Sequence, residues 1–312
     1  QHTPDSTMYA LERTLSISPD DDAGMMPRNS ASHQQSSGRY FRGKFIPADV
    51  NTVAVFHDST RIVSGGDDNK VRIWDVNTGV ELCTMVGHTS RVNAVAVFAD
   101  GKRVVSGSQD NTVKIWDAES GVELCTMSGH TSNMHCIVYA VAVFADGKRV
   151  VSGGGCDDKT VKIWDAETGA LLHTLSGHSD DVRAVAVFAD GKRVVSGSDD
   201  GTVKIWDAES GKELRTLSGH SGSVNAVAVF ADGTRFVSGS DDKTVKIWDA
   251  ESGTELCSLS GHSNAVTVSA DGRKVVSGSN DGTRKIWRMI IKYVPTKRVS
   301  DLLIKALNED VV

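Results

Sequence analysis

Proline is almost missing from the middle of this 312-residue chain, whose five prolines include none between residues 48 and 294. Because proline cannot donate to a β-ladder, this stretch is compatible with uninterrupted strands. A transmembrane helix needs an apolar run of about 18 residues. The chain has no such run, so no transmembrane helix is predicted. Positive charge is not in excess either: the net charge is −6, which argues against a nucleic-acid-binding protein.

The beginning of the chain has no secretory signal pattern. Residues 1–16 contain neither a basic segment nor an apolar core after it, and there is no initiator methionine. The five cysteines are odd in number, and three of them, in ELCT, ELCT and ELCS, stand a full repeat or more apart. This usage favours a reducing compartment. We therefore expect an intracellular, cytoplasmic protein, with the nucleus as an alternative, and no insertion into a membrane.

What the chain has instead is an internal repeat. Its six tryptophans are separated by 42, 48, 42, 42 and 39 residues, five of them in IWD and the last in IWR. A Gly-His pair follows each of the first five at a constant distance. Such a period is the signature of a repeat architecture. The tryptophans are Trp74, Trp116, Trp164, Trp206, Trp248 and Trp287, and the histidines are His88, His130, His178, His220 and His262.

Each repeat reads as four strands. The segment 92–98 is almost continuously apolar, and the Ala-Asp-Gly after it is a hairpin signal. Further strands are expected over 102–108, 112–118 and 122–127, the last with the alternation of a half-exposed edge. No amphipathic segment of helix length interrupts residues 50–288. A single sheet of this kind cannot bury both faces, whereas copies packed around an axis can.

These motifs resemble the WD-repeat (tryptophan–aspartate) β-propeller family over about 240 residues. The resemblance implies an all-β fold of four-stranded antiparallel blades. Six blades are favoured, and seven would need a degenerate blade assembled from the two termini. We expect a flexible arm over 1–38, the propeller over 39–294, and a tail with a short helix over 295–312. The N-terminal RYFRGKF is expected to close the last blade, with RMIIKYV as its rival.

Every repeat also carries a serine and an aspartate before its tryptophan. Together with the histidine they could be mistaken for a hydrolytic triad. A catalytic site is needed once, whereas these residues recur in every repeat, and the resemblance implies a structural hydrogen-bond network. The first repeat has Lys44 where the histidine is expected. The complete set expected in this network is His88, Ser106, Asp110, Trp116, His130, Ser152, Asp158, Trp164, His178, Ser196, Asp200, Trp206, His220, Ser238, Asp242, Trp248, His262, Ser277, Asp281 and Trp287.

The copies differ in two loops, one after Gly-His and one before the tryptophan strand. The third repeat is longer in both, with NMHCIVY where a sister repeat has RVN, and GGGCDD at 153–158. In the resembling family both loops open on the partner-binding face, so apolar residues there suggest a contact site. The alternative is that Ile137 and Val138 only extend the inner strand. The candidates are Met134, His135, Ile137, Val138, Tyr139, Arg91, Asp181 and Arg183.

We expect no cofactor and no metal. His135, Cys136 and Cys156 could approach one another, but three ligands without paired spacing are a weak zinc signal. A metal-dependent hydrolase with its site in the channel would require carboxylates or histidines on the inner strands. The inner strands contain no acid and no histidine. We therefore expect no enzyme.

The family resemblance implies a scaffold or adaptor that binds a protein or peptide and belongs to a multiprotein complex. A substrate-recognition module of a ubiquitin ligase or of a signalling complex is the alternative. Some ligase receptors of the family carry an arginine two residues after Trp-Asp, and this chain does not. The C-terminal segment 300–312 has a serine N-cap signal and leucines four residues apart, which predict a short helix. Either terminal segment is an alternative docking element.

Overall fold

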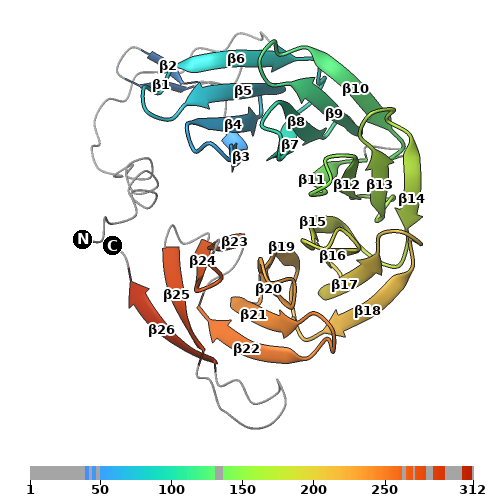
Figure 1. Cartoon of the computed structure of the whole chain (residues 1–312), viewed down its shortest axis with the longest axis vertical. Coiled ribbons are helices and arrows are strands. Elements are labelled where there is room, and N and C mark those ends of the chain that lie inside the picture. The colour runs from blue at the N-terminus through green and yellow to red at the C-terminus, as the bar shows by residue number, and fades with distance from the viewer. Residues whose placement is uncertain are drawn as a thin grey trace, which may run out of the picture. The chain divides into compact units, whose positions relative to one another are not determined.

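The structure is a computed structural model that describes residues 39–41, 44–46, 50–130, 136–261, 265–269, 271–278, 284–291 and 304–310. The chain divides into two units, Gln1–Gln35 and Ser36–Val312, and all described residues lie in the second. The second unit is all-β, with six four-stranded antiparallel sheets arranged as a β-propeller (Figure 1). The expectation of six blades is confirmed. The arm expected over 1–38 lies outside the described residues.

Each blade consists of four consecutive strands that run from the inner to the outer edge of its sheet. The first blade is β3 Val50–Val55, β4 Arg61–Gly66, β5 Lys70–Asp75 and β6 Glu81–Val86, and the second is β7 Val92–Val97, β8 Arg103–Ser108, β9 Thr112–Asp117 and β10 Glu123–Ser128. The third blade is β11 Val138–Val143, β12 Arg149–Gly154, β13 Val161–Asp165 and β14 Leu171–Leu175, and the fourth is β15 Val182–Val187, β16 Arg193–Ser198, β17 Thr202–Asp207 and β18 Glu213–Ser218. The fifth blade is β19 Val224–Val229, β20 Arg235–Ser240, β21 Thr244–Asp249 and β22 Glu255–Ser260, and the sixth is β23 Ala265–Val268, β24 Lys274–Gly278, β25 Arg284–Ile291 and β26 Ile304–Asp310.

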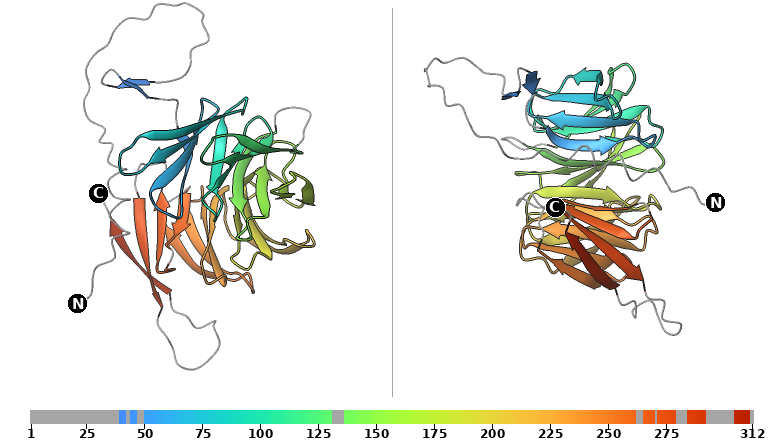
Figure 2. Two further views of the ribbon diagram at one scale, coloured as in Figure 1. Left: turned by 45° about the horizontal axis from the view of Figure 1, so that its top comes forward. Right: turned by 90° about the vertical axis from the view of Figure 1, so that its left-hand side faces the viewer.

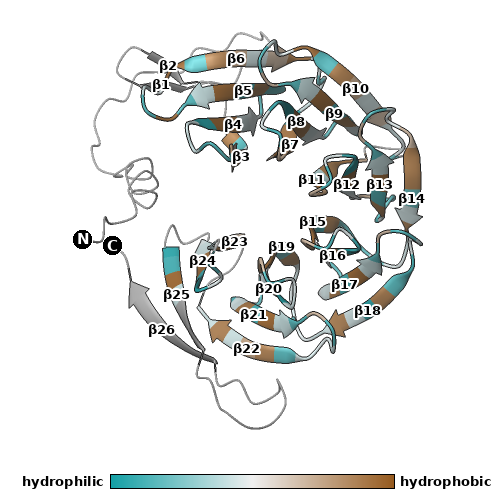
Figure 3. Ribbon diagram, in the orientation of Figure 1, coloured by the Kyte–Doolittle hydropathy of each residue, from teal (hydrophilic) through white to brown (hydrophobic). Residues whose placement is uncertain are grey.

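The turns follow the sequence signals. Gly101 has a φ of 65° in the hairpin between β7 and β8, a left-handed conformation that glycine adopts without strain. The four strands predicted in the second repeat agree with β7–β10 within one or two residues at each end. Hydrophobic residues recur along these strands in Figure 3. The apolar patterns and the turn residues therefore predict the strand order of each blade.

The core lies between blades rather than within them. Val63 and Ile73 of the first blade pack with Val95 and Trp116 of the second. Equivalent clusters join each later blade to the next, as far as the sixth. Figure 2 shows the sheets from two further directions. The tryptophans of the second to sixth blades thus present their rings to the preceding blade, and this packing buries the apolar face that a lone sheet would expose.

The two expectations about the chain ends are wrong. Strand β26, Ile304–Asp310, lies where a short helix was expected, and it pairs antiparallel with β25. An isolated helix of this length is marginal in water, whereas a strand on the open edge of β25 satisfies backbone groups of both segments. Strand β26, and not RYFRGKF, therefore closes the last blade; β1 Arg39–Phe41 pairs instead with β2 Lys44–Ile46. The rival segment 288–294 begins inside β25.

No helix among the residues that the structure describes is long and apolar enough to cross a bilayer.

Candidate functional site

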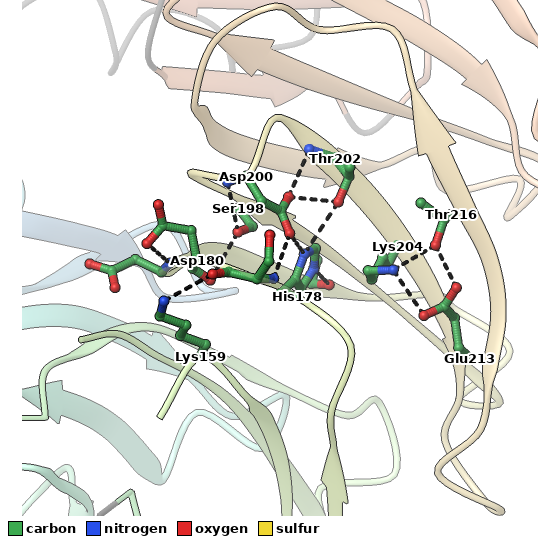
Figure 4. A network of polar contacts seen from close by, with 12 residues as sticks. Lys159, His178, Asp180, Ser198, Asp200, Thr202, Lys204, Glu213 and Thr216 are labelled. Carbon is green, nitrogen blue, oxygen red and sulfur yellow. Dashed lines mark hydrogen bonds and ion pairs between the residues drawn. The ribbon is translucent and has the colours of Figure 1, made fainter. Parts of the chain in front are cut away.

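A buried polar network stands at the heart of the fourth blade (Figure 4). The His178 ring lies with Nδ1 2.9 Å from Oδ2 of Asp200 and Nε2 2.8 Å from Oγ of Ser196. Trp206 donates its Nε1–H to the same Oγ, at 2.8 Å. The aspartate also accepts from the hydroxyl and the backbone N–H of Thr202. The side chains of His178, Ser196, Asp200 and Trp206 are therefore joined in one chain of hydrogen bonds.

Three more blades contain the same network, and two contain parts of it. In the first blade Trp74 donates to Ser64, but Asp68 pairs with Arg72 instead of a histidine. In the sixth blade Trp287 donates to Ser277 at 3.0 Å. His262 and Asp281 lie outside the described residues. The complete sets are His88, Ser106, Asp110 and Trp116; His130, Ser152, Asp158 and Trp164; and His220, Ser238, Asp242 and Trp248.

The connections match those of a hydrolytic triad, but the surroundings do not. The indole N–H can only donate, so the serine hydroxyl accepts from it; the same hydroxyl lies within hydrogen-bond distance of Nε2 of the histidine, and Nδ1 of the ring lies against the aspartate. Ser106 and Ser196 have no exposed surface, so a substrate cannot reach either oxygen. Every donor in the chain of hydrogen bonds has an acceptor. The arrangement suits a connector that ties one strand to the next, because buried polar groups need partners.

The network holds its aspartates ionised. Burial by itself would raise the pKa of Asp110, but hydrogen bonds from His88 and Thr112 outweigh it, and the pKa lies below its ordinary value. The pKa of Asp242 is lowered in the same way, to about 2. For His130 and His220 burial dominates over the nearby aspartate and lowers the pKa of the ring below 6.5. His130 and His220 are therefore neutral connectors between a charged aspartate and an uncharged serine.

Stability is expected to fall as the medium is acidified below about pH 6.5. The unfolded chain, in which His130 and His220 have their ordinary pKa of 6.5, takes up protons before the folded chain does. The unfolded state then binds more protons, so acid favours unfolding. A second loss follows below about pH 4 as the aspartates, whose pKa values are depressed on folding, become protonated. Melting temperatures measured between pH 8 and 3 check this.

A variant with exposed His57 changed to glutamine is the control, because it removes one histidine outside the network. It is expected to keep the wild-type pH profile, whereas His130→Asn flattens the first decline. A melting temperature that stays level from about pH 7 to pH 5 would contradict the assignment of buried neutral histidines.

Buried lysines make a second recurring contact that the sequence patterns did not reveal. Lys204 donates to Glu213 at 2.9 Å and to Thr216 at 2.6 Å, and only 7% of the lysine is exposed (Figure 4). The second and fifth blades have equivalent pairs. In these blades the lysine of the tryptophan strand and the glutamate of the next strand are separated by the same number of residues. This constant spacing is the sequence signal from which the ion pair could have been predicted. In the third blade Leu171 replaces the glutamate.

Changing Leu171 to glutamate is expected to stabilise the protein by about 0.5–1 kcal/mol. Lys162 is 5% exposed and has only Asp158, 3.4 Å away, as an ionic partner among the described residues. A glutamate at 171 would supply the acceptor that the sister blades have. The gain is small because the equivalent glutamate stays about one-third exposed. Thermal or urea denaturation measures it.

Leu172→Glu is the matched control for that substitution. Leu172 is similarly exposed on the same strand, at 42% against 46%, and the repeat pattern supplies no buried lysine for it. It is expected to leave stability unchanged. Equal effects of the two glutamates would show that general charge, and not the pairing with Lys162, is responsible.

The two variable loops meet at one end of the blades, as expected. The N–H of Gln109 donates to the carbonyl of Arg91 at 2.9 Å, and Asp199 and Asp181 are joined in the same way. Lys159 of the third blade reaches the carbonyl of Ser179 in the loop of the fourth, at 2.9 Å (Figure 4). We call this end of the blades the loop rim. The second insertion of the third repeat, at 153–158, lies in it.

Tyr139 and Arg183 form the centre of a polar and aromatic cluster on the loop rim. The guanidinium carbon lies 4.1 Å from the centre of the tyrosine ring. It is also paired with Asp199 at 2.6 Å and with Asp181 at 3.4 Å. Burial by itself would lower the pKa of Arg183. The two aspartates and the tyrosine have the larger, opposite effect, so the pKa lies above its ordinary value. The cluster therefore holds a fixed positive charge between two carboxylates.

The second insertion makes room for the ring of Tyr139. A side chain on Gly155 would collide with the ring of Tyr139, so the extra glycines of GGGCDD allow the ring to lie against the backbone. The N–H of Cys156 donates to Asp181 at 2.6 Å, which orients that carboxylate. Cys156 has a φ of 61°, a conformation uncommon outside glycine. The second insertion therefore shapes the surroundings of Tyr139 and Asp181.

The remaining contact candidates differ in their exposure. Val138 is fully buried as the first residue of β11, so its assignment as a contact residue is wrong: it packs in the core as Val92 and Val182 do. Ile137 is half-buried next to it. Arg91 is exposed and lies 3.6 Å from Asp67. Met134 and His135 lie outside the described residues.

Of the three residues of the alternative zinc site, Cys136 and Cys156 are described and His135 lies outside the described residues. Cys136 is buried, Cys156 is half-buried, and all five cysteines are free. Burial raises the pKa of Cys156, and nearby Asp181 adds to the effect, so this thiol is a poor source of thiolate. No group of three or more His, Cys, Asp or Glu residues within the described ranges is placed to hold a metal ion.

An arginine on each of four blades links it to the next blade. Arg103 lies over the ring of Phe98, 4.1 Å from its centre, pairs with Asp100, and donates to the carbonyl of Gly147 at 3.0 Å. The repeated run FADGKR contains the phenylalanine, aspartate and arginine of this contact. By itself the run predicts only a turn. These contacts stand at the opposite end of the strands from the loop rim. The equivalents are Arg61, Arg149 and Arg193.

A comparison with known families agrees with this geometry. The model for the WD domain, G-beta repeat (WD40) matches six segments of the chain: 38–75, 79–117, 121–165, 169–207, 211–249 and 253–288. No individual curated protein matches the chain. The six matched segments end at the tryptophan strands of the six blades. With most of its length covered by these repeats, the chain belongs to the WD40 family.

Proposed function

We propose that this chain is a non-enzymatic scaffold or adaptor that binds a protein or peptide partner on its loop rim, as a subunit of a larger assembly. WD40 propellers serve in general as protein-interaction scaffolds. The observation that carries the proposal for this chain is the Tyr139–Arg183 cluster, against which the second insertion of the third repeat packs. We also place the protein inside the cell, since all five of its cysteines are free.

The cluster has the features of a contact site. Aromatic residues and arginine are enriched where interfaces concentrate their binding energy. About a third of the Arg183 side chain is exposed, and its two aspartates are mostly covered, so the charges are already oriented before a partner arrives. Preorganised groups lose little conformational entropy on binding. The second and fifth blades have Asn93 and Asn225 at the same position, so the scaffold does not require Tyr139 or Arg183.

This equivalence supplies the test. Tyr139→Asn and Arg183→Asn each install the residue that sister blades carry, so the blades are expected to stay folded. A partner captured from the native source by the wild-type chain in stoichiometric amounts should be lost, or bound at least about tenfold more weakly, by the double variant. Replacement of 133–139 by Arg-Val-Asn should have the same effect. Isothermal titration with the purified partner measures the affinities.

Two results would overturn the proposal. If the captured partner binds the double variant and the loop replacement as tightly as the wild type, its site is not this cluster. If the purified chain turns over a substrate and Ser106→Ala abolishes that turnover while the chain stays folded, the non-enzymatic assignment is wrong. Asn93→Ala, on the loop rim but outside the cluster, is the control for unspecific changes.

A further inference from the structure

Two of the five cysteines lie outside the repeat pattern, and both belong to the third repeat. Cys136 stands in the run NMHCIVY, and Cys156 stands in GGGCDD. The other three, Cys83, Cys125 and Cys257, recur at one position of the outer strands β6, β10 and β22. Each of the two longer loops of the third repeat therefore contributes one cysteine that its sister repeats lack.

The backbone brings these two cysteines opposite each other. Strands β11 and β12 pair up to their shared end, and just beyond it the N–H of Gly155 donates to the carbonyl of Ile137 at 2.9 Å. Cys136 and Cys156 are the next residues on the two segments. Residues that face each other in an antiparallel ladder have Cα atoms about 4.5–5.5 Å apart, and a disulfide needs about 4.4–6.8 Å. The register therefore places the pair within reach of a disulfide.

The surroundings of the Cys156 side chain agree with this register. Burial raises the pKa of its thiol, the charge of Asp181 and the nearby thiol of Cys136 add to the effect, and a hydrogen bond from the backbone of Ile137 opposes it. The sulfur of Cys156 therefore lies close to Cys136 and to the residue that follows it. The backbone of Cys156 is held in place as well, because its N–H donates to Asp181 at 2.6 Å.

The two thiols differ in their access to a reagent. Cys136 is 0% exposed, although Ser90 and Asp180, which take its place in the second and fourth blades, are half-buried and exposed. Cys156 is partly exposed. A reagent in solution can therefore reach Cys156 first, and Cys136 waits behind it as the second thiol of the pair.

We propose that Cys136 and Cys156 form a reversible disulfide by exchange with a small-molecule disulfide of the glutathione type. The Cys156 thiol gives its proton to water, and the thiolate attacks one sulfur of glutathione disulfide, which releases one glutathione thiolate and leaves a mixed disulfide. The Cys136 thiolate then attacks the Cys156 sulfur and releases the second glutathione. The two cysteines lose two electrons and two protons, and the reagent becomes two glutathione thiols.

Such a bond is a redox-sensitive modification of the loop rim. Disulfides of proteins in a reducing compartment are usually transient and redox-sensing. Cys156 also holds Asp181, one of the two carboxylates that pair with Arg183. The oxidised and reduced forms of the pair would therefore differ next to the Tyr139–Arg183 cluster.

The test is incubation of the full chain with mixtures of reduced and oxidised glutathione, followed by alkylation of the remaining thiols and mass spectrometry of the peptides. The wild type is expected to lose two thiols and to give one cross-link, between Cys136 and Cys156. Cys125→Ser removes a partly buried cysteine outside the pair, so this matched control should give the same cross-link. A wild type that keeps both thiols at every glutathione ratio would overturn the proposal.

Cys136→Ser separates the two steps of the exchange. It installs the side chain that Ser90 has at the same place, so the blade is expected to fold, and Cys156 should stop at the mixed disulfide with glutathione. Cys156→Ser should leave Cys136 unmodified, because that thiol has no exposed surface. The proposal is wrong if wild-type Cys156 also remains a mixed disulfide, or if its cross-link goes to another cysteine.

A comparison of folded and urea-unfolded wild type shows whether the fold builds the pair. The equilibrium constant for this cross-link against glutathione should fall by about a hundredfold in urea, because the unfolded chain must close the loop between the two cysteines. Equal constants in the two states would mean that the fold does not favour the pair, and the proposal would fail.

The pH dependence of the rate identifies the attacking thiol. The titratable groups around Cys156 are Asp181, Cys136, Asp157 and Tyr139, and none of these four is a cation. Burial, as the main cause, raises the pKa of Cys156 above its ordinary value, so oxidation should become about tenfold faster from pH 7 to pH 8 as the thiolate fraction grows. A rate that is level over this range would contradict an attack by Cys156.

Discussion

Replacing Trp206 with alanine is expected to lower the free energy of unfolding by about 3–5 kcal/mol. The ring is 1% exposed and packs in the cluster that joins the third blade to the fourth. Its loss leaves a cavity between two sheets and removes the donor to Ser196. Urea denaturation followed by circular dichroism measures the change.

Trp74→Ala is the matched control for that substitution. Trp74 makes the same hydrogen bond, to Ser64 at 2.8 Å, but its ring is only half-buried. The two variants therefore lose the same hydrogen bond and differ in the packing that they remove. We expect a clearly smaller destabilisation for Trp74→Ala. Equal losses would mean that the hydrogen bond, and not the burial between blades, sets the contribution of the tryptophan.

Replacing Asp200 with alanine is expected to destabilise the protein by about 2–4 kcal/mol, since each buried donor left without an acceptor costs about 1–3 kcal/mol. The carboxylate accepts from the ring of His178, from the hydroxyl of Thr202 and from two backbone N–H groups. Water can reach part of the site, so these costs do not add fully. The same denaturation measurement applies.

Asp68→Ala tests whether the histidine is what makes this aspartate important. Asp68 stands at the same position of the first blade, where Arg72 takes the place of the histidine as partner. Arg72 keeps a second carboxylate, Glu81, when Asp68 is removed. We expect a loss of no more than about 1 kcal/mol, typical of a partly exposed pair. A loss as large as that of Asp200→Ala would contradict the network account.

The blades were predictable because their information is local and repeated. Gly101 and its equivalents place a turn, and the alternation on each side of it sets the strand register, so a period read along the chain gives the sheet. The serine, histidine, aspartate and tryptophan could be grouped for the same reason. Their recurrence separated a connector from a catalytic site before the burial of Ser106 showed it.

The chain ends and the rim cluster were not predictable in the same way. Ile304–Asp310 carries a helix pattern, yet it forms a strand because β25 offers an open edge, and no local pattern reports such an edge. Tyr139 and Arg183 stand in different repeats, and only the closeness of neighbouring inner strands brings them within 4.1 Å. Val138 illustrates the opposite case: it belonged to the inserted run, and the position it took in β11 made it core.

The sequence by itself determined the family, the four-stranded blade and the polar network, since the motifs behind them recur in successive repeats and depend on contacts within one repeat or between neighbouring repeats. It favoured six blades and left seven open. Only the tertiary structure decided which strand ends the last blade and which inserted residues remain at the surface. These features depend on what lies beside a residue in space. A repeat pattern describes the interior of a stack well, because every interior blade has the same neighbours, and it describes the ends poorly, because there the neighbours change.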